Sequence, residues 1–190
     1  MTVTPKAQGD LDGLCGPYAI VNAYQFCGKR NKRICEQIFQ TSCSAMSLRR
    51  WPKALWDGTE IGDMRRMLRK CQSEISELAN ISVSYPFQRN APGDTDSYWD
   101  ELDKIWRNPK AICAIVGVTK PGWHWSVIKA STTSGRIVIT DSDTKPASRT
   151  INKSKIFAGD FRNSANKPRS FVRSQLILFS KESTQGSNYR

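Results

Sequence analysis

Apolar and polar positions divide the chain into a helix-like first part and a strand-like second part. From Cys15 onward, apolar residues fall on most sides of a helical period, with Pro17 near the start and Gly28 after the end. This pattern predicts a buried helix preceded by an extended lead-in of about ten residues. Three further helices are predicted before residue 78, over residues 34–39, 47–56 and 61–71.

The pattern changes after residue 78. Residues 81–87 alternate as in a strand, residues 90–96 form a loop, and residues 97–107 predict one more helix. Apolar runs bounded by turn residues then predict four strands, over residues 111–118, 124–130, 136–141 and 171–179. Residues 131–135 (Ser-Thr-Thr-Ser-Gly) predict a hairpin turn between the second and third of these strands. Helices followed by strands indicate an α+β fold, in which a helical first half packs on a C-terminal antiparallel sheet.

A chain of 190 residues fits one domain, assigned to residues 1–180, followed by a polar tail over residues 181–190 that we expect to be disordered. The first residues carry no apolar run of the secretory type, so we expect a cytoplasmic protein, or one delivered into a target cell by a signal-independent route. No run is long enough to cross a bilayer, and no membrane partner is expected.

The net charge of the chain bears only on which partners the protein could bind. The 29 Lys and Arg against 17 Asp and Glu give a net charge of +12, which suits an acidic or DNA-associated protein as partner. The basic residues are spread along the chain without interleaved aromatic residues, so binding to nucleic acid is not required by the pattern.

The six cysteines are interpreted mostly as small buried residues. A chain of this size without an export signal does not need disulfides. No two cysteines form a C-x-x-C pair and there is only one histidine, so no metal site and no cofactor are expected. Cys15 is the exception, because it stands at the start of the buried helix.

His124, the only histidine, follows a Pro-Gly loop at the first position of a strand. A histidine there is held in place yet open to the surface, as a general base must be. Its neighbours Trp123 and Trp125 are candidate walls of a substrate cleft and can shield the ring from water. The alternative is a histidine with a purely structural role.

The predicted hairpin returns residues 140–143 to the neighbourhood of His124. A carboxylate there would orient the imidazole and fix its tautomer. Asp141 is the first candidate and Asp143 the second; the alternative is that both only cap a turn.

Cys15 lies in the sequence Gly13-Leu14-Cys15-Gly16-Pro17. The positive end of a helix favours a thiolate, and the backbone N–H groups of such a turn can hold an oxyanion. The side-chain amide of Gln8 is a candidate second donor. The alternative is a cysteine that packs beneath the helix.

These residues resemble the papain-like cysteine peptidases, and most of all the bacteriocin-processing, double-glycine leader peptidases. The resemblance rests on Gln8, the run from Asp12 to Ala19 (DGLCGPYA), the run from Gly122 to Val127 (GWHWSV), and Ile139-Thr140-Asp141. It implies that Cys15 is the nucleophile, His124 the base, Asp141 its orienting partner and Gln8 the oxyanion donor. It further implies a narrow cleft and cleavage of a protein substrate after small residues such as Gly-Gly. The spacing from Gln8 to Cys15 is one residue longer than in that pattern.

A basic domain of this type also resembles papain-like effectors of bacterial competition, which act as toxins in a target cell and are neutralised by a cognate immunity protein. Two other functions stay open. The same triad could serve an amidase, deamidase or transglutaminase that acts on glutamine or peptidoglycan. A third possibility is a basic nucleic-acid-binding module with an inert cysteine.

Overall fold

A computed structural model describes residues 5–8, 13–120, 122–130, 135–144, 147–159 and 167–182. The helices are α1 (Cys15–Phe26), α2 (Lys32–Ser44), α3 (Trp51–Asp57), α4 (Ile61–Glu74), the short η1 (Ser76–Leu78), α5 (Thr95–Arg107) and the short η2 (Lys153–Lys155). The strands are β1 (Ile81–Ser84), β2 (Ala111–Lys120), β3 (His124–Ala130), β4 (Arg136–Thr140), β5 (Ser148–Asn152), β6 (Ile156–Ala158) and β7 (Arg169–Lys181). None of the helices in these ranges is both long and apolar enough to cross a membrane.

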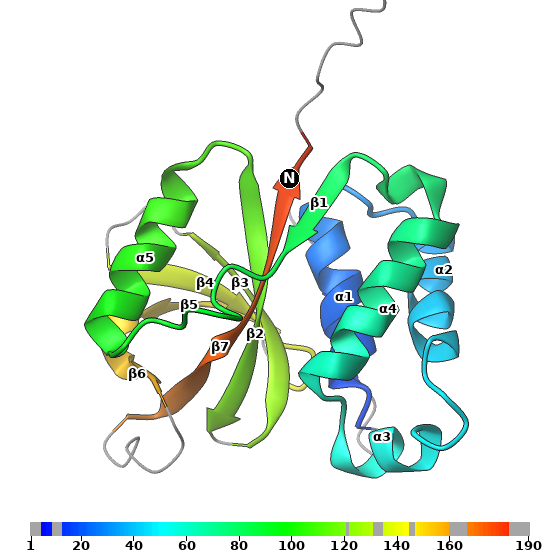
Figure 1. Ribbon diagram of the computed structural model, residues 1–190, viewed down its shortest axis with the longest axis horizontal. Coiled ribbons are helices and arrows are strands. Elements are labelled where there is room, and N and C mark those ends of the chain that lie inside the picture. Colours follow the sequence, from blue (N-terminus) through cyan, green and yellow to red (C-terminus); the bar gives the residue numbers. More distant parts are fainter. Residues whose placement is uncertain are drawn as a thin grey trace, which may run out of the picture.

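Helices α1, α2 and α4 pack together into a layer beside the sheet, and α3 lies at one end of it (Figure 1). Polar residues fix where these helices begin. The side chain of Asn31 accepts a hydrogen bond from the backbone of Arg33 and caps α2. Glu60 and Asp63 form a reciprocal capping box at the start of α4. Helix α1 has buried residues on nearly every side because it lies between its helical neighbours and the sheet.

The sheet has the strand order β1-β7-β2-β3-β4-β5, and every neighbouring pair in this order is antiparallel. The short β6 pairs in parallel with the start of β7. In the register of β3 with β4, Val127 stands opposite Thr140. His124 at the start of β3 and the residue that follows β4 therefore lie at the same end of this hairpin.

Alternation along β2 divides the core in two. Cys113 and Ile115 face the helical layer, whereas Ala114 and Val116 face the cluster beneath α5. Helix α5 covers this second cluster on the side of the sheet away from α1, α2 and α4 (Figure 1). The strand β2 is buried on both faces, so the sheet is a rigid base for the loops at its ends.

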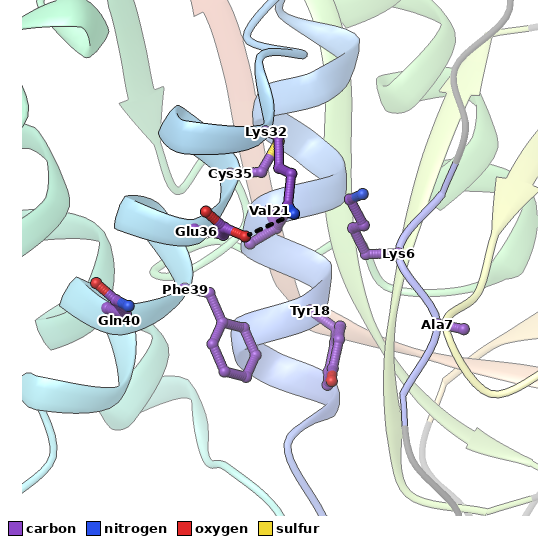
Figure 2. A pocket seen from close by; sticks show the side chains of 9 residues that line it. All are labelled: Lys6, Ala7, Tyr18, Val21, Lys32, Cys35, Glu36, Phe39 and Gln40. Atoms are coloured by element: carbon purple, nitrogen blue, oxygen red, sulfur yellow. Dashed lines mark ion pairs between the residues drawn. The ribbon is translucent and has the colours of Figure 1, made fainter.

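The extended lead-in joins the two halves of the molecule. The backbone N–H of Lys6 donates to Asn22 Oδ1 on α1 at 2.8 Å, and Asn22 Nδ2 donates back to the Lys6 carbonyl at 3.2 Å. Two residues later, the N–H of Gln8 donates to the carbonyl of Ser142 at 2.9 Å, next to the end of β4. This segment lies along an apolar pocket of about 350 Å³ lined by Tyr18 and Phe39, with the Lys32–Glu36 ion pair beside it (Figure 2).

The α+β architecture predicted from the sequence is confirmed, with its helical first half packed on a mainly antiparallel sheet. Strands β5 and β6 were not predicted. The β5 sequence, Ser-Arg-Thr-Ile-Asn, contains one apolar residue because this strand lies at the sheet edge. Residues 131–134 of the turn expected over 131–135, and residues 183–190 of the tail expected over 181–190, lie outside the described residues, whereas Lys181 is the last residue of β7.

Candidate active site

Cys15 is the first residue of α1, and two glycines allow its turn to lie against the end of α3. The N–H of Gly13 donates to the carbonyl of Leu55 at 2.6 Å. A Cβ atom at Gly16 would lie 2.1 Å from Thr59 Oγ1 and 2.7 Å from Met64 Sδ. A larger residue at position 16 would therefore displace the start of α1 from the loop that precedes α4.

The N-terminus of α1 has no side-chain cap and no acidic residue in its first turn. The N–H groups of Cys15 and Gly16 are among the first four of the helix, which have no acceptor within it. Pro17 has no N–H group at all. The positive end of the helix dipole is therefore directed at the Cys15 thiol, and these N–H groups can bind developing negative charge.

His124 begins β3, where it stands opposite Val118 of β2. The following residue, Trp125, is 4% exposed and donates from its indole Nε1 to the carbonyl of Thr59 at 2.7 Å. This bond ties β3 to the same loop that packs on Gly16. The start of the helix and the start of the strand are thus fixed to a common support, and Cys15 and His124 line the same pocket.

Asp141 follows β4 directly and lies against the imidazole. His124 Nε2 is 2.6 Å from Asp141 Oδ1, and the two groups meet as an ion pair rather than as a well-aligned hydrogen bond. Ser126 Oγ donates to Asp141 Oδ2 at 3.2 Å, and the backbone N–H of Asp143 donates to Asp141 Oδ1 at 3.1 Å. Asp141 therefore faces the histidine, while Asp143 contributes only its backbone to this carboxylate.

Burial and charge act in opposite directions on the imidazole. Burial lowers the pKa of His124, but the Asp141 carboxylate and the Cys15 thiol raise it more, to about 10. Burial raises the pKa of Asp141, and His124 together with the Asp143 and Ser126 donors lowers it below its ordinary value. Near neutral pH the pair is therefore an imidazolium and a carboxylate. Because Nε2 faces Asp141, the other ring nitrogen, Nδ1, is the one left to exchange a proton with Cys15.

A pocket of about 450 Å³ opens over these groups. Its lining comes from the start of α1, the loop before α4, the start of β3 and β7, namely Cys15, Asp57, Gly58, Thr59, Glu60, Ile61, Trp123, His124, Trp125 and Gln175. Trp123 is 70% exposed and forms an open wall, whereas Trp125 is the buried floor. Both tryptophans line the pocket in which we expect a substrate to bind.

Two features of this pocket were missed by sequence reasoning. Gln175 reaches it from the middle of β7, across Gly117, where a Cβ atom would lie 2.0 Å from Gln175 Oε1. The exposed carboxylates of Asp57 and Glu60 lie on the rim of the pocket. Glu60 Oε1 is 3.4 Å from Arg50 Nη2. No sequence motif points to these three residues, because only the fold brings them to Cys15.

Gln8, the predicted oxyanion donor, has its backbone next to this site. The Gln8 bond to Ser142 brings residue 8 next to the segment that carries Asp141. Its side chain is not part of the pocket lining around Cys15. The oxyanion role of Gln8 therefore stays a prediction.

The arrangement of a helical layer packed on a mainly antiparallel sheet is the papain-like fold predicted from the sequence. Among solved structures, the chain is similar to the crystal structure of the peptidase domain of Streptococcus ComA, a bifunctional ABC transporter involved in a quorum-sensing pathway. The TM-score is 0.52 at 15% identity, over 93% of this chain and 97% of that chain. No protein-family model matches the sequence, and no curated protein matches it significantly.

Proposed function

We propose that this protein is a cysteine peptidase in which Cys15 is the nucleophile, His124 the general base and acid, and Asp141 the residue that orients the imidazole. One observation carries the proposal: a single pocket contains an uncapped helix N-terminus bearing a thiol and an imidazole held 2.6 Å from a buried carboxylate. The similarity of the fold to a peptidase domain supports the same reaction class.

The reaction starts from the imidazolium form of His124, in which the proton given up by Cys15 lies on Nδ1 and the sulfur is a thiolate. The thiolate attacks the carbonyl carbon of the scissile bond, and the oxygen becomes an oxyanion facing the N–H groups at the start of α1. His124 then gives its proton to the leaving amine, which departs and leaves a thioester on Cys15. A water molecule, deprotonated by His124, hydrolyses this thioester and releases the acid. Asp141 keeps Nε2 occupied throughout, so that Nδ1 stays directed at the sulfur.

The proposed substrate is a protein segment with small residues such as Gly-Gly before the scissile bond. The sequence resemblance to the double-glycine leader peptidases supports this preference. We propose that Trp123, as a wall, and Trp125, as the floor, leave little room for larger side chains. The net charge of +12 supports an acidic or DNA-associated protein as substrate, docked outside the pocket, because the pocket rim itself is acidic at Asp57 and Glu60.

A role as a toxin effector in bacterial competition, with a cognate immunity protein as partner, is proposed from the sequence resemblance. It predicts that the active protein slows growth when it is expressed in the cytoplasm of a bacterium. The Cys15→Ala protein should be harmless at equal expression. If the Cys15→Ala protein were toxic, the toxicity would not depend on the thiol chemistry.

The deciding experiment compares new protein N-termini in bacteria that express wild type, Cys15→Ala or Cys43→Ala. Cys43 is a half-buried thiol of α2 outside the pocket, so this variant controls for loss of a cysteine. We expect new termini, preceded by small residues, with wild type and Cys43→Ala only. Modified but uncut proteins, seen as a mass increase of about one unit per glutamine, would instead indicate a deamidase. A Cys15→Ala variant as active as wild type would refute the proposal.

A further inference from the structure

A second pocket, of about 430 Å³, lies at the β4–β5 edge of the sheet and the start of β7. Among the described residues that line it, four are cationic, Arg136, Arg149, Lys155 and Arg169, and none is a carboxylate. Thr150 and Asn152 add a hydroxyl and an amide. It shares no lining residue with the pocket over Cys15.

Strand pairing brings the residues of this pocket together at one edge of the sheet. Arg136 of β4 stands opposite Asn152 of β5, and its Nε donates to Asn152 Oδ1 at 3.0 Å. Lys155 directly precedes β6, whose first residue, Ile156, stands opposite Arg169 of β7. Arg149 and Arg136 lie on opposite faces of the β4–β5 ladder, and both line the pocket because it lies at the edge strand β5.

Arg149 is the most unusual of the four. It stands opposite Ile139, a fully buried residue of the cluster beneath α5, so its stem lies on the apolar side of the sheet. Its Nε is buried and has no hydrogen-bond partner among the described residues. A buried guanidinium donor that makes no bond costs free energy, and a bound anion would remove that cost.

Charge balance points the same way. Among the described residues, neither Arg149 nor Lys155 forms an ion pair with a carboxylate. Arg169 reaches only Asp141, whose Oδ2 is 3.8 Å from its Nη1 and whose charge is already shared with His124. Several converging cations with one distant carboxylate create a positive potential that attracts a multiply charged anion.

We propose that this pocket binds a small anion with two or more phosphate groups, held chiefly by Arg149 and Lys155. Guanidinium groups bind phosphate oxygens through two parallel N–H bonds, and a lysine adds a point charge. The volume is at the lower end of the range for small-molecule sites and suits such an anion. The free anion and the phosphate chain of a nucleotide offer the same chemistry.

Calorimetric titration of the full-length protein with sodium pyrophosphate tests this proposal. We expect saturable binding to wild type and equally to Cys15→Ala, since the site is separate from the thiol. Arg149→Gln and Lys155→Gln should each weaken binding about tenfold or more, as loss of a charged hydrogen bond does. Arg89→Gln, which removes an exposed charge elsewhere, should leave the affinity unchanged. Lys155 is itself exposed, so its variant tests the site even where Arg149→Gln disturbs folding.

Further titrations distinguish a nucleotide from a free phosphate anion and test other kinds of ligand. If ADP binds to wild type and binds more weakly to Arg149→Gln and Lys155→Gln, the ligand is a nucleotide. If pyrophosphate binds and ADP does not, the ligand is the free anion. Citrate bound as tightly as pyrophosphate would overturn the assignment to phosphate. Equal affinity in all variants, or binding of a DNA duplex without binding of pyrophosphate, would overturn the site. None of these outcomes depends on peptidase activity.

Discussion

Asp141, one residue beyond the last registered pair of the β3–β4 hairpin (Val127–Thr140), lies diagonally across from His124, the first residue of β3, with Nε2 and Oδ1 2.6 Å apart. Ser126 stands next to Asp141 across the hairpin. Its hydroxyl donates to Asp141 Oδ2, while His124 faces Oδ1, so the carboxylate is held at both oxygens. The spacing of these groups is therefore set by the end of a paired hairpin, which gives the precise orientation that the proposed catalytic pair requires.

Replacing Asp141 by Asn should lower kcat by about 10²- to 10⁴-fold, because the imidazole loses the group that orients it and stabilises its positive charge. Asp143→Asn keeps the backbone N–H that bonds Asp141 and should retain nearly full activity. Steady-state kinetics on a Gly-Gly peptide checks both. Equal losses in the two variants would contradict the assignment of Asp141.

The pH dependence follows from the raised pKa of His124. A pKa of about 10 keeps the imidazolium through neutral pH, so kcat/KM should fall only as pH rises through about 10. In Asp141→Asn this basic limb should move to lower pH, toward the ordinary value of 6.5. An unmoved limb would mean that another group controls it.

The same shifts predict how stability depends on pH. Since the folded-state pKa of His124 is raised, its contribution is complete below pH 6.5 and is lost as pH rises through about 10. The lowered pKa of Asp141 acts in the other direction: its contribution is present above its ordinary value of 3.8 and is lost as pH falls through the native value. Urea unfolding of wild type and Asp141→Asn should therefore converge at both alkaline and strongly acidic pH.

Gly16→Ala should destabilise the protein by about 1–3 kcal/mol and reduce activity, because the new methyl group would overlap Thr59 Oγ1. Gly62→Ala is the matched control. It lies near the start of α4 with nothing within 4 Å of the added Cβ, so stability should be unchanged or slightly higher. Thermal unfolding and peptide cleavage measure the two effects. Similar behaviour of the two variants would mean that the α1 turn tolerates displacement.

The oxyanion donor can be identified by comparing two glutamines. If Gln8 supplies it, Gln8→Ala should lower kcat by about 10²- to 10³-fold with little change in KM, as loss of such a donor does. Gln175, which lines the pocket from β7, should then affect mainly KM when it is replaced by Ala. The reverse result would assign the oxyanion contact to Gln175.

The acidic side chains on the pocket rim, Asp57 and Glu60, should affect which peptides are cleaved fastest. A peptide with Lys beside the Gly-Gly pair should be cleaved about two- to fivefold faster than one with Asp, the size of effect expected from exposed charges. The double variant Asp57→Asn/Glu60→Gln should remove this difference. Glu36→Gln, on α2, should preserve it. A preference for Asp in wild type would show that the rim does not contact this part of the substrate.

The sequence was most informative where local patterns coincide with the proposed catalytic positions. A helix start with Cys15 and a hairpin with His124 and Asp141 on its two strands can be inferred from periodicity and turn residues. The fold class follows from the same patterns and is confirmed by the structure. The choice between Asp141 and Asp143 required the register, because both residues lie at the same hairpin end.

Other contributions depend on long-range packing. Gln175 lies within a strand that was recognised only as apolar, and its amide reaches the pocket across a glycine of a neighbouring strand. Strand β5 has too few apolar residues to be predicted, so the position of Arg149 in a cationic pocket could not be foreseen. Such residues have no local signal, because what matters is the strand that stands beside them.

A chain with a single histidine offers an unusual experimental advantage. In its proton NMR spectrum, imidazole ring resonances come from His124 alone, so their titration reports the protonation of the proposed base without any assignment by mutagenesis. A histidine-directed acylating reagent likewise has one target. Inhibitors, substrates and binding partners can therefore be screened by whether they shift or protect one signal, even before any cleavage product is known.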